Sequence, residues 1–200
     1  MDEIELRKYL GMDVTRGIKL APQDPMWREI FKRILFPRLK KSLKKFPVNY
    51  ISHVGSTAIE TISHAKPILD VAVLLDHKLQ ESQNLRDEIS WQLHYDGILT
   101  SGDHRFFDSN HHPNILIAAC PEDSNIYMCL LHLLSNRSNI QRTMYNDLVR
   151  FRDFMNVNPD KAAEYVKFKE EAILKYKSIT DYNDSKGSFV ERILKEEKEG

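Results

Sequence analysis

The amino-acid sequence predicts an α+β fold in which helices flank one mixed β-sheet and a helical region completes the chain. Short apolar segments bounded by glycine, proline and polar clusters alternate with helical patterns up to about residue 136, and only helical patterns follow. The chain is 42% hydrophobic and 29% charged, which suits a packed core with an ordinary polar surface. Strands and helices in this order indicate helices packed against a sheet.

The first long helix is expected to begin near Asp24, which suits an N-cap, with Pro25 at the first helical position. Pro37 is expected to kink this helix, because proline has no N–H to donate and its ring crowds the preceding turn. Apolar residues recur at helical spacing along it: Trp27, Ile30, Phe31, Ile34, Leu35, Leu39 and Leu43.

Two strands are expected around a short helix. The first covers residues 48–54 and ends at Gly55, and the second covers residues 67–75. Thr57 and Glu60 fit a capping box that would open the short helix between them. A helix near 79–95 follows, and further strands are expected at 98–100, 105–107, 114–119 and 127–134, the last two as an antiparallel hairpin.

The rest of the chain is predicted to be helical. Ser138 can cap a helix whose apolar stripe comprises Ile140, Met144, Leu148, Phe151 and Met155. Asn158 and Pro159 open another helix, and a last one carries Phe189 and Ile193. We therefore expect one domain over residues 1–200, with a sheet-containing core over 1–136 and C-terminal helices over 137–200.

Charge and cysteine usage narrow the class of protein. Lysine plus arginine and aspartate plus glutamate number 29 each, and this balance argues against a general nucleic-acid binder. No apolar stretch approaches the ~20 residues that span a bilayer, so no membrane insertion is expected. The acidic N-terminus does not resemble a secretory signal, and the expected location is cytoplasmic. Cys120 and Cys129 fit no metal-binding spacing and are expected to be small, half-buried apolar residues.

The residues that most strongly suggest a binding or catalytic site are Gly55, Ser56 and Thr57, followed by Lys66 and Asp70. A glycine allows close approach of a ligand, a hydroxyl can bond a phosphate oxygen, and a helix N-terminus offers free N–H groups. An acid within an apolar strand is costly unless it is paired or binds a metal, and Mg²⁺ prefers carboxylate and phosphate oxygens. The pattern predicts a site for a nucleotide or another phosphate-bearing small molecule, with Asp70 as the catalytic and Mg²⁺-binding acid. The structural alternative is that Gly55 only turns the chain and the hydroxyls only cap a helix.

This block resembles the GSTAV…KPxxD signature of the GrpB-like family. Six further segments resemble that family's motifs in the same order: Asp24–Trp27 (DPxW), Arg105–Phe107 (R-x-F), Leu131–Leu134 (LHVV), Phe151–Phe154 (FRDYL), Tyr165 with Lys169 (YxxLK) and Tyr182 with Lys186 (YxxxK). The resemblance implies the nucleotidyltransferase superfamily fold. In that superfamily a Gly-Ser turn and acids spaced D-x-D or D-x-E bind Mg²⁺, which clamps a nucleoside triphosphate. On this basis Lys186 joins the phosphate-binding candidates, and Arg105, His132 and Tyr182 are further candidate residues.

The sequence departs from the superfamily pattern at one position. Strand alternation places Asp70 and Ala72 on the same face, so the second carboxylate of a metal pair is absent. Two hypotheses follow. The chain is an enzyme, or a former enzyme, that binds nucleotide with one Mg²⁺ at most, or it is a non-catalytic binding or interaction module that has kept the fold.

A zinc site is a further possibility, since His104, His111 and His112 cluster in the sequence. The neighbouring positions of His111 and His112 argue against it, because adjacent side chains of an extended chain point to opposite sides.

Overall fold

The computed structural model describes residues 6, 8–77, 83–98, 115–120, 123–176 and 179–199. The elements follow in this order: β1 (Met12–Asp13), η1 (Val14–Arg16), β2 (Ala21–Pro22), α2 (Met26–Ile30), η2 (Phe31–Leu35), α3 (Phe36–Ser42), β3 (Val48–Val54), η3 (Ser56–Ala58), β4 (His64–Ala65), β5 (Leu69–Leu75), α4 (Gln83–Tyr95), β6 (Ile115–Cys120), β7 (Asp123–Ser135), α5 (Asn139–Val157), α6 (Pro159–Lys175) and α7 (Ile179–Glu199).

The larger sheet is mixed, as predicted. Its described strands run in the order β1-β7-β5-β3, with β6 also paired to β7. Strands β5 and β7 are parallel, whereas the other pairs are antiparallel. Strand β7 begins at Asp123, so the predicted hairpin has a shorter connection than expected. A separate pair of short strands, β2 and β4, lies near the start of β5.

The two faces of β5 are covered by different helices. Leu69, Val71 and Val73 pack in a core with residues from α2, α3 and α4. Ala72 and Leu74 face the other way, in a second cluster to which α5 contributes. Burial on both faces explains why this strand is an almost unbroken apolar run. Because side chains alternate along a strand, Asp70 lies on the same face as Ala72 and Leu74, towards the C-terminal helices.

The first helical region is interrupted before Pro37. The Asp24 carboxylate accepts a hydrogen bond from the Met26 backbone N–H, so Asp24 caps the helix as expected. Residues Phe31–Leu35 then form a π-helical segment before α3. Because Pro37 cannot donate to the carbonyl of Arg33, a local change of hydrogen-bonding register at this point has a clear cause.

The predicted capping box at Thr57 and Glu60 is wrong. The segment between β3 and β5 contains one 3-10 turn, Ser56–Ala58, instead of an α-helix. Thr57 is buried, and its hydroxyl lies 2.9 Å from His53 Nε2 and donates to the Ile68 carbonyl at 3.2 Å. These partners lie on the flanking segments, so the Thr57 side chain cannot turn back to cap the backbone that follows it.

Helices α5 and α6 begin where the sequence predicts. Ser138 accepts a hydrogen bond from the Gln141 N–H at the start of α5, and α6 begins at Pro159. The expected stripe on α5 is wrong at Ile140, which is 79% exposed. Gln141 and Tyr145 are buried instead, and Ile140 points about 100° away from Gln141 around the helix.

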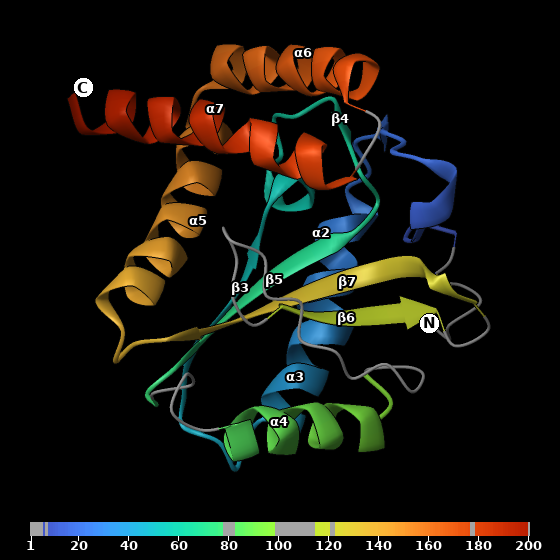
Figure 1. The fold of residues 1–200 in the computed structure, drawn as a ribbon, viewed down its shortest axis with the longest axis vertical. Helices are drawn as coiled ribbons and strands as arrows, with labels where there is room; N and C mark the ends of the chain where they lie inside the picture. The colour runs from blue at the N-terminus through green and yellow to red at the C-terminus, as the bar shows by residue number, and fades with distance from the viewer. Residues whose placement is uncertain are drawn as a thin grey trace.

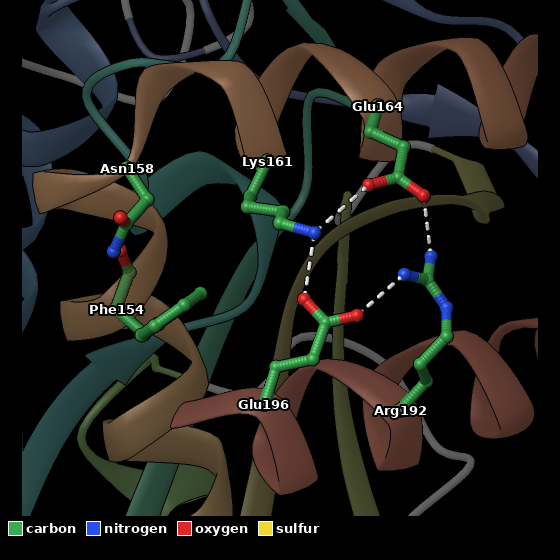
Figure 2. A network of polar contacts seen from close by, with 6 residues as sticks. All are labelled: Phe154, Asn158, Lys161, Glu164, Arg192 and Glu196. Carbon is green, nitrogen blue, oxygen red and sulfur yellow. Dashed lines mark hydrogen bonds and ion pairs between the residues drawn. The ribbon is translucent and has the colours of Figure 1, made fainter. Parts of the chain in front are cut away.

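Helix α7 is held against α6 by aromatic packing and by ion pairs. Tyr165 of α6 stacks on Phe189 of α7, with ring centroids 5.1 Å apart. Outside this contact, Figure 2 shows four charged residues that alternate in sign between the helices. Their ion pairs are Lys161–Glu196 at 2.6 Å, Arg192–Glu164 at 2.5 Å, Arg192–Glu196 at 2.8 Å and Lys161–Glu164 at 3.6 Å. Figure 1 shows α6 and α7 above the sheet, with the first turns of α7 beside the chain between β4 and β5.

Some sequence predictions lie outside the described residues. These are the strand at 105–107, the strand at 98–100 beyond Ile98 (which itself lies in a bend), the first residues of the helix that is described from Gln83, and the side chains of Arg105, His104, His111 and His112. Within the described part of the chain, no helix is long and apolar enough to cross a membrane. Cys129 of β7, which pairs with Leu69 of β5, is buried in the core, more so than the sequence predicted.

Candidate functional site

The site is built around Asp70, the second residue of β5. Asp70 pairs with Val54 on β3 and with Leu130 on β7, so it lies in the middle of the sheet. Gly55 follows β3 directly and has a φ of 68°, a left-handed conformation that side chains disfavour. A Cβ at Gly55 would lie 2.8 Å from the Asp70 Cβ and closer still to its carboxylate oxygen. The room that glycine leaves is therefore filled by Asp70 itself.

Cationic groups surround the Asp70 carboxylate. His132 Nε2, from β7, lies 3.2 Å from Asp70 Oδ1. Burial acts to raise the pKa of Asp70, but the hydrogen bond from His132 and the charges of His132, Lys66 and Lys186 outweigh it and hold that pKa below 3.8. Asp70 is thus a carboxylate that stays ionised, and its side chain is 28% exposed.

Three lysines come together here from separate segments. Lys66 precedes β5, and its Nζ lies 5.2 Å from the centroid of the Tyr182 ring and 3.4 Å from Asn183 Oδ1. Lys186 of α7 places its Nζ 4.8 Å from the same ring centroid. Lys169 of α6 is 1% exposed and donates to the His64 carbonyl at 2.7 Å.

Burial disfavours the ammonium form of all three lysines, and for Lys66 and Lys186 the charge of Asp70 offsets this only in part. Burial lowers the pKa of Lys66, and it lowers that of Lys186 well below the ordinary value, while Asp70 raises both again in part. Burial also lowers the pKa of Lys169 to about 7, with the charge of Lys66 acting in the same direction and that of Glu170 against it. When protonated, the three lysines also repel one another, and this contributes to the lowered pKa values of Lys169 and Lys186.

Two buried tyrosines complete the cluster. Burial raises the pKa of Tyr165 to about 12, and Ser56, as a hydrogen-bonding neighbour, lowers it in part. Tyr182 is fully buried, and burial together with Tyr165 raises its pKa. The Tyr182 hydroxyl has no hydrogen-bond partner among the described residues. A buried hydroxyl without a partner is costly, so this O–H would gain stability by donating a hydrogen bond to an acceptor atom of a ligand.

Most of the residues singled out in the sequence meet at this point. They form a cluster, called the lysine cluster below, with Gly55 and His132 at its border. Its members are Ser56, Lys66, Asp70, Tyr165, Lys169, Tyr182 and Lys186. Thr57 differs, because its hydroxyl is already bonded to His53 and Ile68. Tyr165 is buried in the core, as its motif position led us to expect, but the place of Lys169 in this cluster was missed. The signal was the four-residue spacing of Tyr165 and Lys169, which repeats that of Tyr182 and Lys186.

The described residues do not fit a magnesium ion. Ala72 is fully buried in an apolar cluster with Val54 and Leu74, where a second carboxylate would be needed. Among the residues that the structure describes, no three His, Cys, Asp or Glu side chains gather as metal ligands. The neighbours of Asp70 include Lys66 and Lys186, whose ammonium form opposes the charge of a divalent cation.

Comparison with known proteins agrees with the family resemblance of the sequence motifs. The sequence model described as "GrpB protein" matches residues 17–196. The glutamate-rich protein GrpB of Alkalihalophilus pseudofirmus is 25% identical over 189 residues, which cover 92% of this chain and 99% of that protein. The crystal structure of conserved protein GrpB from Enterococcus faecalis has the same fold, with a TM-score of 0.65 at 24% identity over 89% of this chain and 96% of that chain. Because the family model covers most of the chain, this protein belongs to the GrpB family.

Proposed function

We propose that this protein binds a phosphate-bearing small molecule at the lysine cluster, with a nucleotide as the class that the predicted superfamily suggests. The observation that carries this proposal is the gathering of three lysines: Lys66 and Lys186 lie over the Tyr182 ring near Asp70, and Lys169 lies near Lys66 and Lys186. Lysine is a common phosphate ligand and acts there as a point charge. A multiply charged anion would offset the repulsion between these ammonium groups and raise their pKa values towards the ordinary range.

Nucleotidyl transfer through two metal ions is not part of the proposal. That reaction needs carboxylates that hold both ions about 4 Å apart. The position that would supply the second carboxylate is Ala72, which packs against Val54 and Leu74. Binding without transfer is therefore the activity that these residues support.

A thermal-shift screen tests the proposal. The probes are ATP, ADP, pyrophosphate and inorganic phosphate, each with EDTA and with Mg²⁺, and adenosine is the control without phosphate. A probe at ~100 times its dissociation constant should stabilise the protein by about 2.7 kcal/mol. For a chain of this size that corresponds to roughly 5–10 °C in Tm. Stabilisation by adenosine as large as that by ATP would contradict the proposal.

A protein-interaction module is the second candidate, and the apolar surroundings of Ala72 favour it. In that case the fold is kept as a scaffold and the site no longer binds a ligand. This alternative predicts that none of the phosphate-bearing probes changes the Tm in either medium. The screen therefore separates the two candidates.

A further inference from the structure

We infer that the lysine cluster binds the phosphate groups of its ligand without a metal ion, and that Asp70 serves as the internal counterion of Lys66 and Lys186. The ligand chemistry is a pyrophosphate group, either free or at the end of a nucleotide. This inference rests on the proposed phosphate-binding function and adds how the charge of the ligand is neutralised.

The geometry around Tyr182 provides the first argument. Lys66 and Lys186 come from segments more than a hundred residues apart, yet both ammonium groups lie over the same aromatic ring, at 5.2 and 4.8 Å from its centroid. The ring attracts both cations and thereby holds them near each other in spite of their repulsion. Two ammonium groups presented together in this way suit an anion that carries several oxygens and more than one negative charge.

The Tyr182 hydroxyl provides a second, independent argument. It is fully buried on the ring that carries the two lysines, and among the described residues it has no hydrogen-bond partner. The ring also lies close enough to Tyr165 for the two phenols to influence each other, and Ser56 adjoins Tyr165. The cluster thus joins hydroxyl donors to ammonium groups, which is the donor set of a phosphate site and contains no metal ligand beyond Asp70 and His132.

Asp70 distinguishes this account from one based on magnesium. As a metal ligand, Asp70 would attract the ion that binds phosphate, and loss of its charge would abolish binding. As a counterion, it helps to keep Lys66 and Lys186 protonated and competes with the ligand for them. The negative charge of the ligand takes over that role in the complex, so loss of the Asp70 charge would not abolish binding. The two accounts therefore predict different effects of the same substitution.

The test is calorimetric titration of pyrophosphate into the wild-type protein and Asp70→Asn, in EDTA and again in Mg²⁺. Asparagine keeps the shape of the side chain that fills the space beside Gly55. We expect both the wild type and Asp70→Asn to bind in EDTA. Binding that requires Mg²⁺ and disappears in Asp70→Asn would overturn the inference while leaving the phosphate-binding function intact. Absence of binding in both media would overturn both.

A second variant covers the case in which Asp70→Asn does not fold. Lys66→Gln should weaken the binding of pyrophosphate in EDTA about tenfold or more, because one of the two ammonium groups over Tyr182 is lost, and unchanged binding would overturn the inference. Titration of ATP alongside pyrophosphate distinguishes the two sources of the group. Tighter binding of ATP indicates a nucleotide, and equal binding indicates the free anion.

Discussion

At the scale of single residues, the contact between Gly55 and Asp70 determines where the site lies. The sequence indicated a glycine that makes room for a ligand, whereas the structure shows that the room accommodates the Asp70 carboxylate. This could not be read from the sequence, because it depends on the pairing of β3 with β5, which puts Asp70 opposite Val54. What the sequence did predict correctly is that Gly55 ends the strand.

Gly55→Ala should destabilise the protein far more than Gly17→Ala. Both glycines have a positive φ, at 68° and 84°, so each substitution carries the left-handed penalty of about 1–2 kcal/mol. A Cβ at Gly17 meets nothing within 4 Å, whereas one at Gly55 would displace Asp70. We expect an additional loss of about 1–3 kcal/mol at Gly55, comparable to overpacking. Urea unfolding measures the stability of both variants. Equal losses of unfolding free energy would show that the Asp70 side chain can move aside at no energetic cost.

His53 should make the protein sensitive to mild acid. Burial lowers its pKa to about 4 in the folded protein, whereas the unfolded chain has 6.5. Between these values the unfolded state binds more protons, so the free energy of unfolding decreases as the pH falls from 6.5 to 4. The total loss is about 3 kcal/mol. Urea unfolding at several pH values should show this slope in the wild type and a weaker one in His53→Gln. Parallel profiles would rule out His53 as the cause.

At the scale of helices and strands, the sequence correctly predicted the features that depend on neighbouring residues. The strand at 48–54, the cap at Ser138 and the start of α6 at Pro159 are all confirmed, because each depends on residues within a few positions. The helix expected at Thr57 is absent, because its hydroxyl finds partners on β3 and before β5 instead. Ile140 was misplaced for a related reason, since only packing against the sheet decides which face of α5 is buried.

The apolar face of β5 that carries Ala72 leads to a prediction about the effect of a buried charge. Ala72→Asp should destabilise the protein by several kcal/mol, because it buries a charge in an apolar cluster. Ala72→Ser is the matched control, since it adds a smaller polar group at the same place and should cost less. Thermal unfolding with EDTA and with Mg²⁺ measures the effect. If Mg²⁺ restored the stability of Ala72→Asp, position 72 would be able to complete a metal site, contrary to this account.

At the scale of the whole molecule, the lysine cluster joins segments that lie far apart in the sequence. Its members come from the chain before β5, from β5 itself and from helices α6 and α7. The family signature predicted Ser56, Lys66 and Asp70, and motif spacing predicted Tyr182 and Lys186. Sequence alone could not show that Lys169 turns inwards, because α6 has exposed lysines at neighbouring positions. The gathering of the three lysines becomes visible only once the helices are packed on the sheet.

The most direct test of this account is a calorimetric titration of pyrophosphate in EDTA into the wild type, Lys186→Gln and Lys198→Gln. Lys186 lies over Tyr182 in the lysine cluster, whereas Lys198 is exposed at the far end of the same helix. Each substitution removes one lysine from the same helix, so a loss of general electrostatic attraction would appear in both variants. We expect Lys186→Gln to raise the Kd about tenfold or more, which corresponds to about 1.4 kcal/mol, and Lys198→Gln to leave it almost unchanged. Equal Kd values for the two variants would contradict the account, because the anion would then have no defined place in the lysine cluster.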